Sequence, residues 1–157
     1  MTATAAPLDS LPTPDREPQF YDGVRLRRLA AFGVDLIVIL ILLGGVAMIG
    51  VVVGLLTFGL GLAFVIPAFA LTGLAYRTTL IAERSATLGM MLMGIELRDN
   101  MGRPLSLPLA FLHTCGFTAM TYLPPVLIAS LIYAGVNQYG RTLHDALFQV
   151  TMINRPA

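Results

Sequence analysis

The feature that most constrains this chain is an apolar stretch from Leu29 to Tyr76 that contains a single charged residue, Asp35. A helix needs about 20 apolar residues to cross the hydrocarbon core of a bilayer, so this stretch is too long for one crossing and must turn. An aspartate at the centre of such a helix costs about 2.5 to 3.5 kcal/mol on insertion scales. Asp35 is therefore expected to be paired, protonated or turned toward the protein interior.

The composition also indicates a membrane protein. Apolar residues make up 56% of the chain and charged residues 12%, against about 45 to 50% and about 25% in soluble proteins. The mean hydropathy is +0.77. The net charge of +1 provides no basic excess for a phosphate backbone, so no nucleic-acid partner is expected. We therefore expect an integral membrane protein in contact with a lipid bilayer.

The N-terminal residues 1–22 differ from the rest of the chain. They contain several prolines among small polar residues, which is typical of a disordered tail. They lack the basic head and apolar core of a cleaved signal peptide, so the first membrane helix is expected to be retained. Arg25, Arg27 and Arg28 come directly before the apolar stretch, and basic flanks of this kind stay in the cytoplasm. We expect a cytoplasmic tail, followed by a membrane domain over residues 23–157.

Glycines divide the long apolar stretch into two helices. Residues 54–61 are rich in glycine, which weakens a helix and permits positive φ angles. This pattern predicts a helical hairpin with helices at about 28–53 and 59–80. Gly50 and Gly54 form a small-residue pair that would let another helix approach closely, and Pro67 is predicted to kink the second helix.

Charged and turn-forming residues return after Ala82, which places the segment up to Leu107 outside the lipid core on the cytoplasmic side. The apolar piece Thr87–Gly94 is too short to cross a bilayer and is predicted to lie at the interface. Residues 95–99 alternate apolar and polar side chains before the turn residues 100–102, which predicts a small β-hairpin.

A third apolar segment extends from about 107 to 136 and is interrupted by Pro124 and Pro125. Adjacent prolines remove two amide donors, so the segment is predicted to form two half-helices. It either crosses the membrane once or returns as a helical hairpin. A return keeps all ten basic residues on the cytoplasmic side, which the positive-inside rule favours. It also lets residues 148–154, which alternate like a strand, pair with residues 95–99. The fold class we expect is an all-α integral membrane protein with this small β element.

Few residues are suited to chemistry. Arg28 and Asp35 lie seven residues apart, which places them within about 20° on one helix face but about 10 Å apart along its axis. Arg141 and Asp145 are four residues apart beside His144, and a histidine is expected to titrate near neutral pH. This group is either a polar site or a solvated interfacial turn. His113, in an apolar segment, is predicted to be a hydrogen-bonded interior residue rather than a metal ligand.

The sequence lacks the usual signatures of an enzyme. With two histidines and one cysteine, the chain has neither the ligands of a typical structural metal site nor a possible intramolecular disulfide. It contains no nucleophile triad, no phosphate-binding loop and no nucleotide-binding glycine motif. We therefore expect no catalytic residue, no cofactor and no metal.

Three motifs occur in order along the chain. They are Arg28-Leu-Ala-Ala-Phe-Gly-Val-Asp35, Ala86-Thr-Leu-Gly89 followed by Gly94-Ile-Glu-Leu-Arg-Asp-Asn-Met-Gly102, and Arg141-Thr-Leu-His-Asp145. Together they resemble the RDD family of membrane proteins, over about residues 24–154. The family is named for one arginine and two aspartates, which correspond here to Arg28, Asp35 and Asp145. It commonly has a lysine where this chain has Met90, so the contacts of that lysine are not expected here.

The resemblance implies either cation/proton exchange or an accessory role in a membrane complex. We favour a non-catalytic membrane subunit or assembly factor, in a bacterial cytoplasmic (inner) membrane, acting as a homo-oligomer or with other membrane proteins. The alternative is cation/proton exchange or small-solute transport with Asp35 as the proton or ion site. In both cases Arg28, Asp35 and Asp145 are expected to form one polar cluster near the cytoplasmic interface. We expect an arginine from elsewhere in the fold to contact Asp35, with Arg141 the first candidate.

Overall fold

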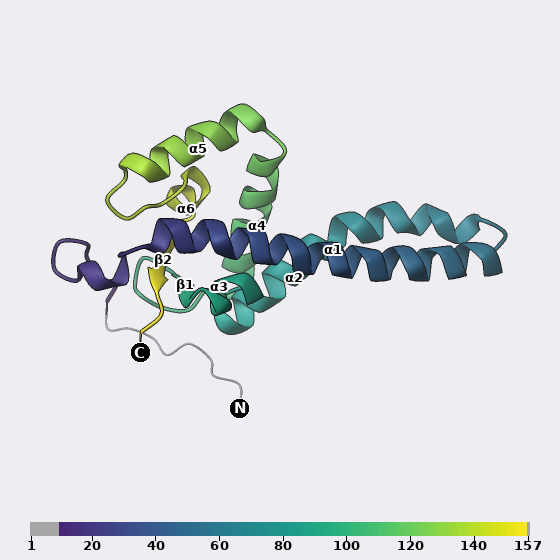
Figure 1. Ribbon diagram of the computed structural model, residues 1–157, viewed down its shortest axis with the longest axis horizontal. Coiled ribbons are helices and arrows are strands. Elements are labelled where there is room, and N and C mark those ends of the chain that lie inside the picture. The colour runs from purple at the N-terminus through teal and green to yellow at the C-terminus, as the bar shows by residue number, and fades with distance from the viewer. Residues whose placement is uncertain (1–9, 157) are drawn as a thin grey trace.

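The computed structural model describes residues 10–156, so residues 1–9 of the predicted tail lie outside the described part of the chain. The described residues form helices and one small sheet (Figure 1). The helices are α1 (Val24–Leu56), α2 (Val65–Arg84), α3 (Leu88–Leu92), α4 (Leu107–Thr121), α5 (Pro124–Val136) and α6 (Leu143–Leu147), the strands are β1 (Ile95–Arg98) and β2 (Thr151–Asn154), and two short 3₁₀ helices are η1 (Pro18–Phe20) and η2 (Leu60–Phe64).

Helices α1 and α2 pack against each other and extend well beyond the other elements (Figure 1). The chain reverses at Phe58 and Gly59, which have φ angles of 51° and 93°. Glycines on α1 allow close packing beside the turn, because a Cβ added at Gly50 would lie 2.5 Å from the Val65 side chain and one at Gly54 would lie 2.8 Å from the Leu62 side chain. The predicted role of this glycine pair in packing is therefore confirmed.

Pro67 does not kink the second helix, contrary to the prediction. The α-helix begins at Val65, after η2, so Pro67 lies in its first turn. Amides in the first turn have no partner within their own helix, so a proline is accommodated there without breaking the helix.

Helices α4 and α5 confirm the prediction of two half-helices. Pro124 and Pro125 are the first two residues of α5, and the axes of α4 and α5 are bent by 115°. Among residues 10–156, two helices are long and apolar enough to cross a membrane, and there are three such segments if the bent pair counts as one. The chain is thus a mostly helical protein with two or three candidate membrane spans.

Strands β1 and β2 form a two-stranded antiparallel sheet, in which Ile95 lies opposite Asn154 and Arg98 lies opposite Thr151. Pairing of the C-terminal strand with residues 95–98 was predicted, whereas the local β-hairpin around residues 100–102 does not form. Asp99 does close a turn with Arg103, but α4 begins soon afterwards at Leu107. The other edge of β1 is occupied as well, since the Leu97 amide donates to the Ser85 carbonyl over 2.7 Å.

The buried core lies where α1, α3, α4 and the sheet meet. Its fully buried side chains include Ile95, Leu97, Ala110 and Val150. The described part of the N-terminal tail contacts the C-terminal strand, because the Asn154 side-chain amide donates to the carbonyls of Gln19 and Asp22. The two ends of the described chain are thus held at the same end of the molecule.

Candidate functional site

Asp35 lies on α1, is 1% exposed, and accepts hydrogen bonds at both carboxylate oxygens. The Tyr76 hydroxyl donates to Oδ1 over 2.8 Å and the Gly89 amide donates to the same oxygen over 2.9 Å. The Thr87 hydroxyl donates to Oδ2 over 2.6 Å. These donors come from α2, from α3 and from the N-cap of α3, so one carboxylate joins three segments of the chain.

The arginine nearest to Asp35 is Arg77 on α2, whose Nη1 lies 3.8 Å from Oδ2. Its guanidinium also lies 4.4 Å from the centre of the Phe117 ring, a cation–π contact. The proposal that Arg141 contacts Asp35 is wrong. Arg141 is directed toward the sheet, where its Nε donates to the Thr151 hydroxyl over 2.7 Å and its guanidinium stacks on Tyr139.

The Thr-Leu-Gly sequence before Met90 has a direct structural explanation. The Thr87 hydroxyl caps α3 by accepting from the Met90 amide, while it donates to Asp35. Gly89 brings α3 close to α1, since an added Cβ would lie 2.1 Å from the Ala31 carbonyl oxygen and 2.9 Å from Asp35 Oδ1. Only glycine fits this approach between two backbones.

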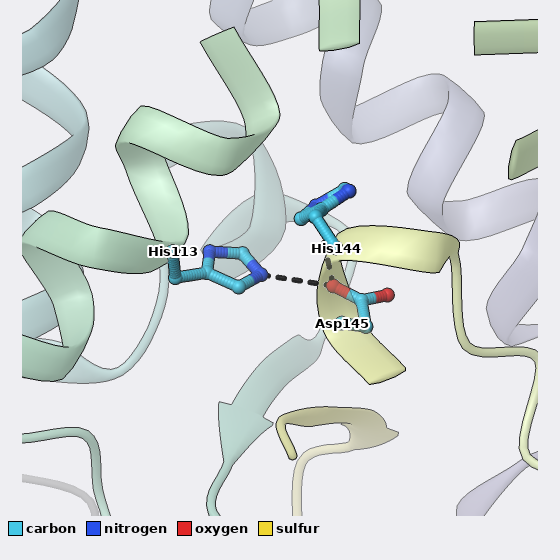
Figure 2. Close-up of side chains that lie close together, drawn as sticks. All are labelled: His113, His144 and Asp145. Atoms are coloured by element: carbon cyan, nitrogen blue, oxygen red, sulfur yellow. Dashed lines mark hydrogen bonds and ion pairs between the residues drawn. The ribbon is translucent and has the colours of Figure 1, made fainter. Parts of the chain in front are cut away.

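Asp145 lies on α6, is fully buried, and forms a second polar network (Figure 2). Its Oδ2 is paired with Arg28 and accepts from the Thr142 amide over 3.0 Å, as part of the capping box of α6. Its Oδ1 lies 2.8 Å from His113 Nε2 and 3.3 Å from His144 Nε2. Asp145 therefore connects α6 to α1 and to α4.

Burial and neighbouring charges set the protonation states in this network. Burial lowers the pKa of His144 to about 4, against the opposing effect of the Asp145 carboxylate, so the imidazole is neutral at neutral pH. Burial alone would raise the pKa of Asp145. Arg28 and the hydrogen bond from His113 outweigh burial and hold that pKa well below its usual range. Asp145 is thus a buried carboxylate with a full set of partners.

The structure divides the predicted three-member cluster into two networks, Asp35 with Arg77 and Asp145 with Arg28. Between them lies a cavity of about 260 Å³ that both networks line. Most of the remaining lining is apolar and comes from α1, α4 and α5, with Phe32, Phe117 and Leu127 among the lining residues. His113, predicted to be an interior residue, is 4% exposed and lies in the second network.

Ligand atoms of His113, His144 and Asp145 all lie within 4.8 Å of one another, a spacing that could hold a metal ion. Arg28 already neutralises the Asp145 carboxylate, however, and both imidazoles are directed at its Oδ1. A divalent cation here would leave a large uncompensated positive charge in a buried place, which is energetically costly. Without a metal ion, His113 Nε2 is hydrogen-bonded to Asp145 and His144 Nδ1 lies 3.0 Å from the Thr142 hydroxyl.

Several partners of Asp35 were not predicted from the sequence, namely Tyr76, Arg77, Thr87 and Gly89. One signal was available, because Tyr76 and Arg77 are the residues at which the apolar stretch ends. In an antiparallel hairpin, the end of the second helix lies beside the start of the first. Arg77 is thus the cation that the hairpin itself brings near Asp35.

The match to protein families agrees with these motifs. The model of the RDD family matches residues 23–149, which include both networks. No curated protein and no solved structure matches the chain. The match covers most of the 157 residues, and with its apolar helices the chain is a membrane protein that belongs to the RDD family.

Proposed function

We propose that this chain is a non-catalytic membrane subunit or assembly factor of a bacterial cytoplasmic membrane, in which two buried carboxylates hold the helices in register. The observation that supports this proposal most directly is the full set of donors at each carboxylate. Asp35 accepts from Tyr76, Thr87 and Gly89, and Asp145 accepts from Thr142 and pairs with Arg28.

A transported cation needs free carboxylate oxygens that it can bind and leave. At Asp35 a cation would displace three hydrogen bonds and approach Arg77, whose Nη1 is 3.8 Å from Oδ2. Both effects oppose ion binding. Both favour a fixed cross-link between helices, since removing one partner of a buried pair costs more than the pair itself contributes.

The surface of the α1–α2 hairpin also suits a subunit. Its outward side chains are large and apolar, and Ile41, Met48 and Leu55 are among the exposed ones. In a bilayer these side chains contact lipid, another copy of the chain or other membrane proteins. Gly44 and Gly45 have open space around them, which would let a partner helix approach closely.

We further propose that α4 and α5 enter the membrane and return, so that both chain ends are cytoplasmic. Arg25, Arg27 and Arg28 favour a cytoplasmic N-terminus, and Asn154 is bonded to residues near that end. A fluorescent protein fused after Ala157 should therefore fluoresce, and alkaline phosphatase at the same position should be inactive. Phosphatase inserted after Thr57, at the far end of the hairpin, should be active. Active phosphatase after Ala157 would contradict the returning arrangement.

Cation/proton exchange is the second candidate, because the cavity between the two networks is lined by Asp35, His113 and His144. A path for protons or ions would have to include such a cavity. The small size of the chain opposes this function unless several copies assemble.

The change Asp35→Asn separates the two candidates. Asparagine keeps the shape but has one acceptor oxygen, so its NH₂ group faces a donor and the pair with Arg77 is lost. We expect a loss of about 3 kcal/mol in stability and weaker assembly into native complexes. Proteoliposomes of the parent protein should show no more proton-coupled cation flux than protein-free liposomes.

The matched control is Asp15→Asn, at an exposed acid, which should leave stability and assembly unchanged. Flux in the parent protein that disappears in a folded Asp35→Asn variant would overturn the subunit proposal and establish exchange.

A further inference from the structure

Two cavities lie next to each other at the start of α1 and share one residue, Arg25. The inner cavity, of about 260 Å³, extends from Arg25 and Arg28 past Phe32 to Met120, Thr121 and Leu127 near the α4–α5 bend. The outer cavity has a volume of about 400 Å³. It is lined by residues that follow η1, such as Tyr21, and by residues of the loop after α5, such as Gln138 and Tyr139. Arg25 thus lies between the outer cavity, whose lining is partly polar, and the inner cavity, whose lining is mainly apolar.

We propose that these cavities bind one anionic phospholipid, with its phosphate at Arg25 and an acyl chain in the inner cavity. The inner cavity opens sideways, because Leu29 and Leu131 line it and are 69% and 60% exposed. In a bilayer those side chains face hydrocarbon. An apolar space open to hydrocarbon is filled by lipid chains, since voids cost packing contacts and water finds few free partners there.

The polar groups that line the inner cavity do not change this assignment. Asp35 accepts a hydrogen bond from Tyr76 and lies near the Arg77 guanidinium, and Arg28 is paired with Asp145. Their hydrogen-bonding capacity is directed into the protein, so the surface that remains available to an occupant is mainly hydrocarbon.

The charge at the mouth favours a phosphate. Arg25 donates to the Asn137 carbonyl over 3.0 Å and has no acidic partner within ion-pair distance among residues 10–156. Asp22 also lines the outer cavity and opposes an anion. Arg141 is likewise without an ion pair in the described part of the chain, and its guanidinium stacks on Tyr139, which lines the outer cavity. Arginines at a cytoplasmic interface attract anionic lipids in the same way.

The geometry also matches the orientation of a lipid in the cytoplasmic leaflet. Arg25 lies at the start of the first membrane helix, whereas Met120, Thr121 and Leu127, which also line the inner cavity, lie beside the α4–α5 bend. A headgroup at Arg25 places the acyl chain beside the α4–α5 bend, which is the orientation of a lipid in the cytoplasmic leaflet.

The test is retention of phosphatidylglycerol compared with phosphatidylcholine by the purified full chain, measured by native mass spectrometry during stepwise removal of lipid. We expect preferential retention of one phosphatidylglycerol molecule. The change Arg25→Gln should weaken that retention about fivefold, as expected for one arginine at an anionic headgroup. Arg27→Gln is the matched control, because Arg27 is exposed on the same helical turn but lines neither cavity, and it should change retention little.

A second measurement locates the acyl chain. Phosphatidylglycerol with a photoreactive group near the chain end should label residues 117–131, and Leu127→Trp, which fills the inner cavity, should remove that labelling. Equal retention of both lipids, or equal effects of Arg25→Gln and Arg27→Gln, would overturn the headgroup assignment. Labelling confined to the distal part of the α1–α2 hairpin would overturn the proposed cavity.

Discussion

Gly89→Ala should destabilise the protein by about 3 kcal/mol or more, because two backbones meet at this residue. An added Cβ would lie 2.1 Å from the Ala31 carbonyl oxygen, and backbone atoms cannot rotate away as a side chain can. Overpacking a core typically costs about 1 to 3 kcal/mol. Here the displacement of α3 would also remove the hydrogen bond from the Gly89 amide to Asp35. The free energy of unfolding in mixed detergent micelles measures the effect.

Gly73→Ala is the control for this change. Gly73 lies in α2, and an added Cβ there would meet nothing within 4 Å. Because alanine is the better helix former by about 1 kcal/mol, the control should be neutral or slightly stabilising. Equal stability of the two variants would show that α3 does not pack against α1 as described.

The local composition of the chain was sufficient to predict two long apolar helices and the two half-helices that follow them. The apolar stretch, the glycines near residue 59 and the adjacent Pro124 and Pro125 each act within a few residues of their own position. The pairing of residues 95–98 with the C-terminal strand was also predictable, because both segments alternate polar and apolar side chains. The local β-hairpin was not, because a turn sequence does not determine whether a second strand follows it.

The partners of Asp35 could not be predicted in the same way. An isolated acid in an apolar helix indicates that a partner exists, but spacing along one helix identifies only candidates on that helix, such as Arg28. Arg28 instead reaches Asp145, more than 100 residues away in the sequence, through the packing of α6 against α4 and α5. The partners of Asp35 come from the second helix and from α3, and their positions depend on how the hairpin is closed.

The second large effect is expected for Arg28→Gln. This change leaves the Asp145 carboxylate fully buried and without its guanidinium partner, next to two imidazoles. Removing one partner of a buried ion pair costs about 3 to 5 kcal/mol, because the remaining charge stays desolvated. Arg28 also donates to the Gly140 carbonyl over 3.1 Å, so the loop before α6 should loosen. Unfolding in mixed micelles and faster hydrogen exchange at residues 140–147 are the measurements.

Arg103→Gln provides the comparison for this pair. Arg103 is 59% exposed and is paired with Asp99 at a spacing of four residues, and exposed pairs contribute at most about 1 kcal/mol. Adding Asp145→Asn to Arg28→Gln should recover part of the lost stability, since the double variant no longer buries an unpaired charge. If Arg28→Gln were no more destabilising than Arg103→Gln, the Arg28–Asp145 pair would not connect α1 to α6. The proposal that buried carboxylates hold the helices together would then be wrong for Asp145.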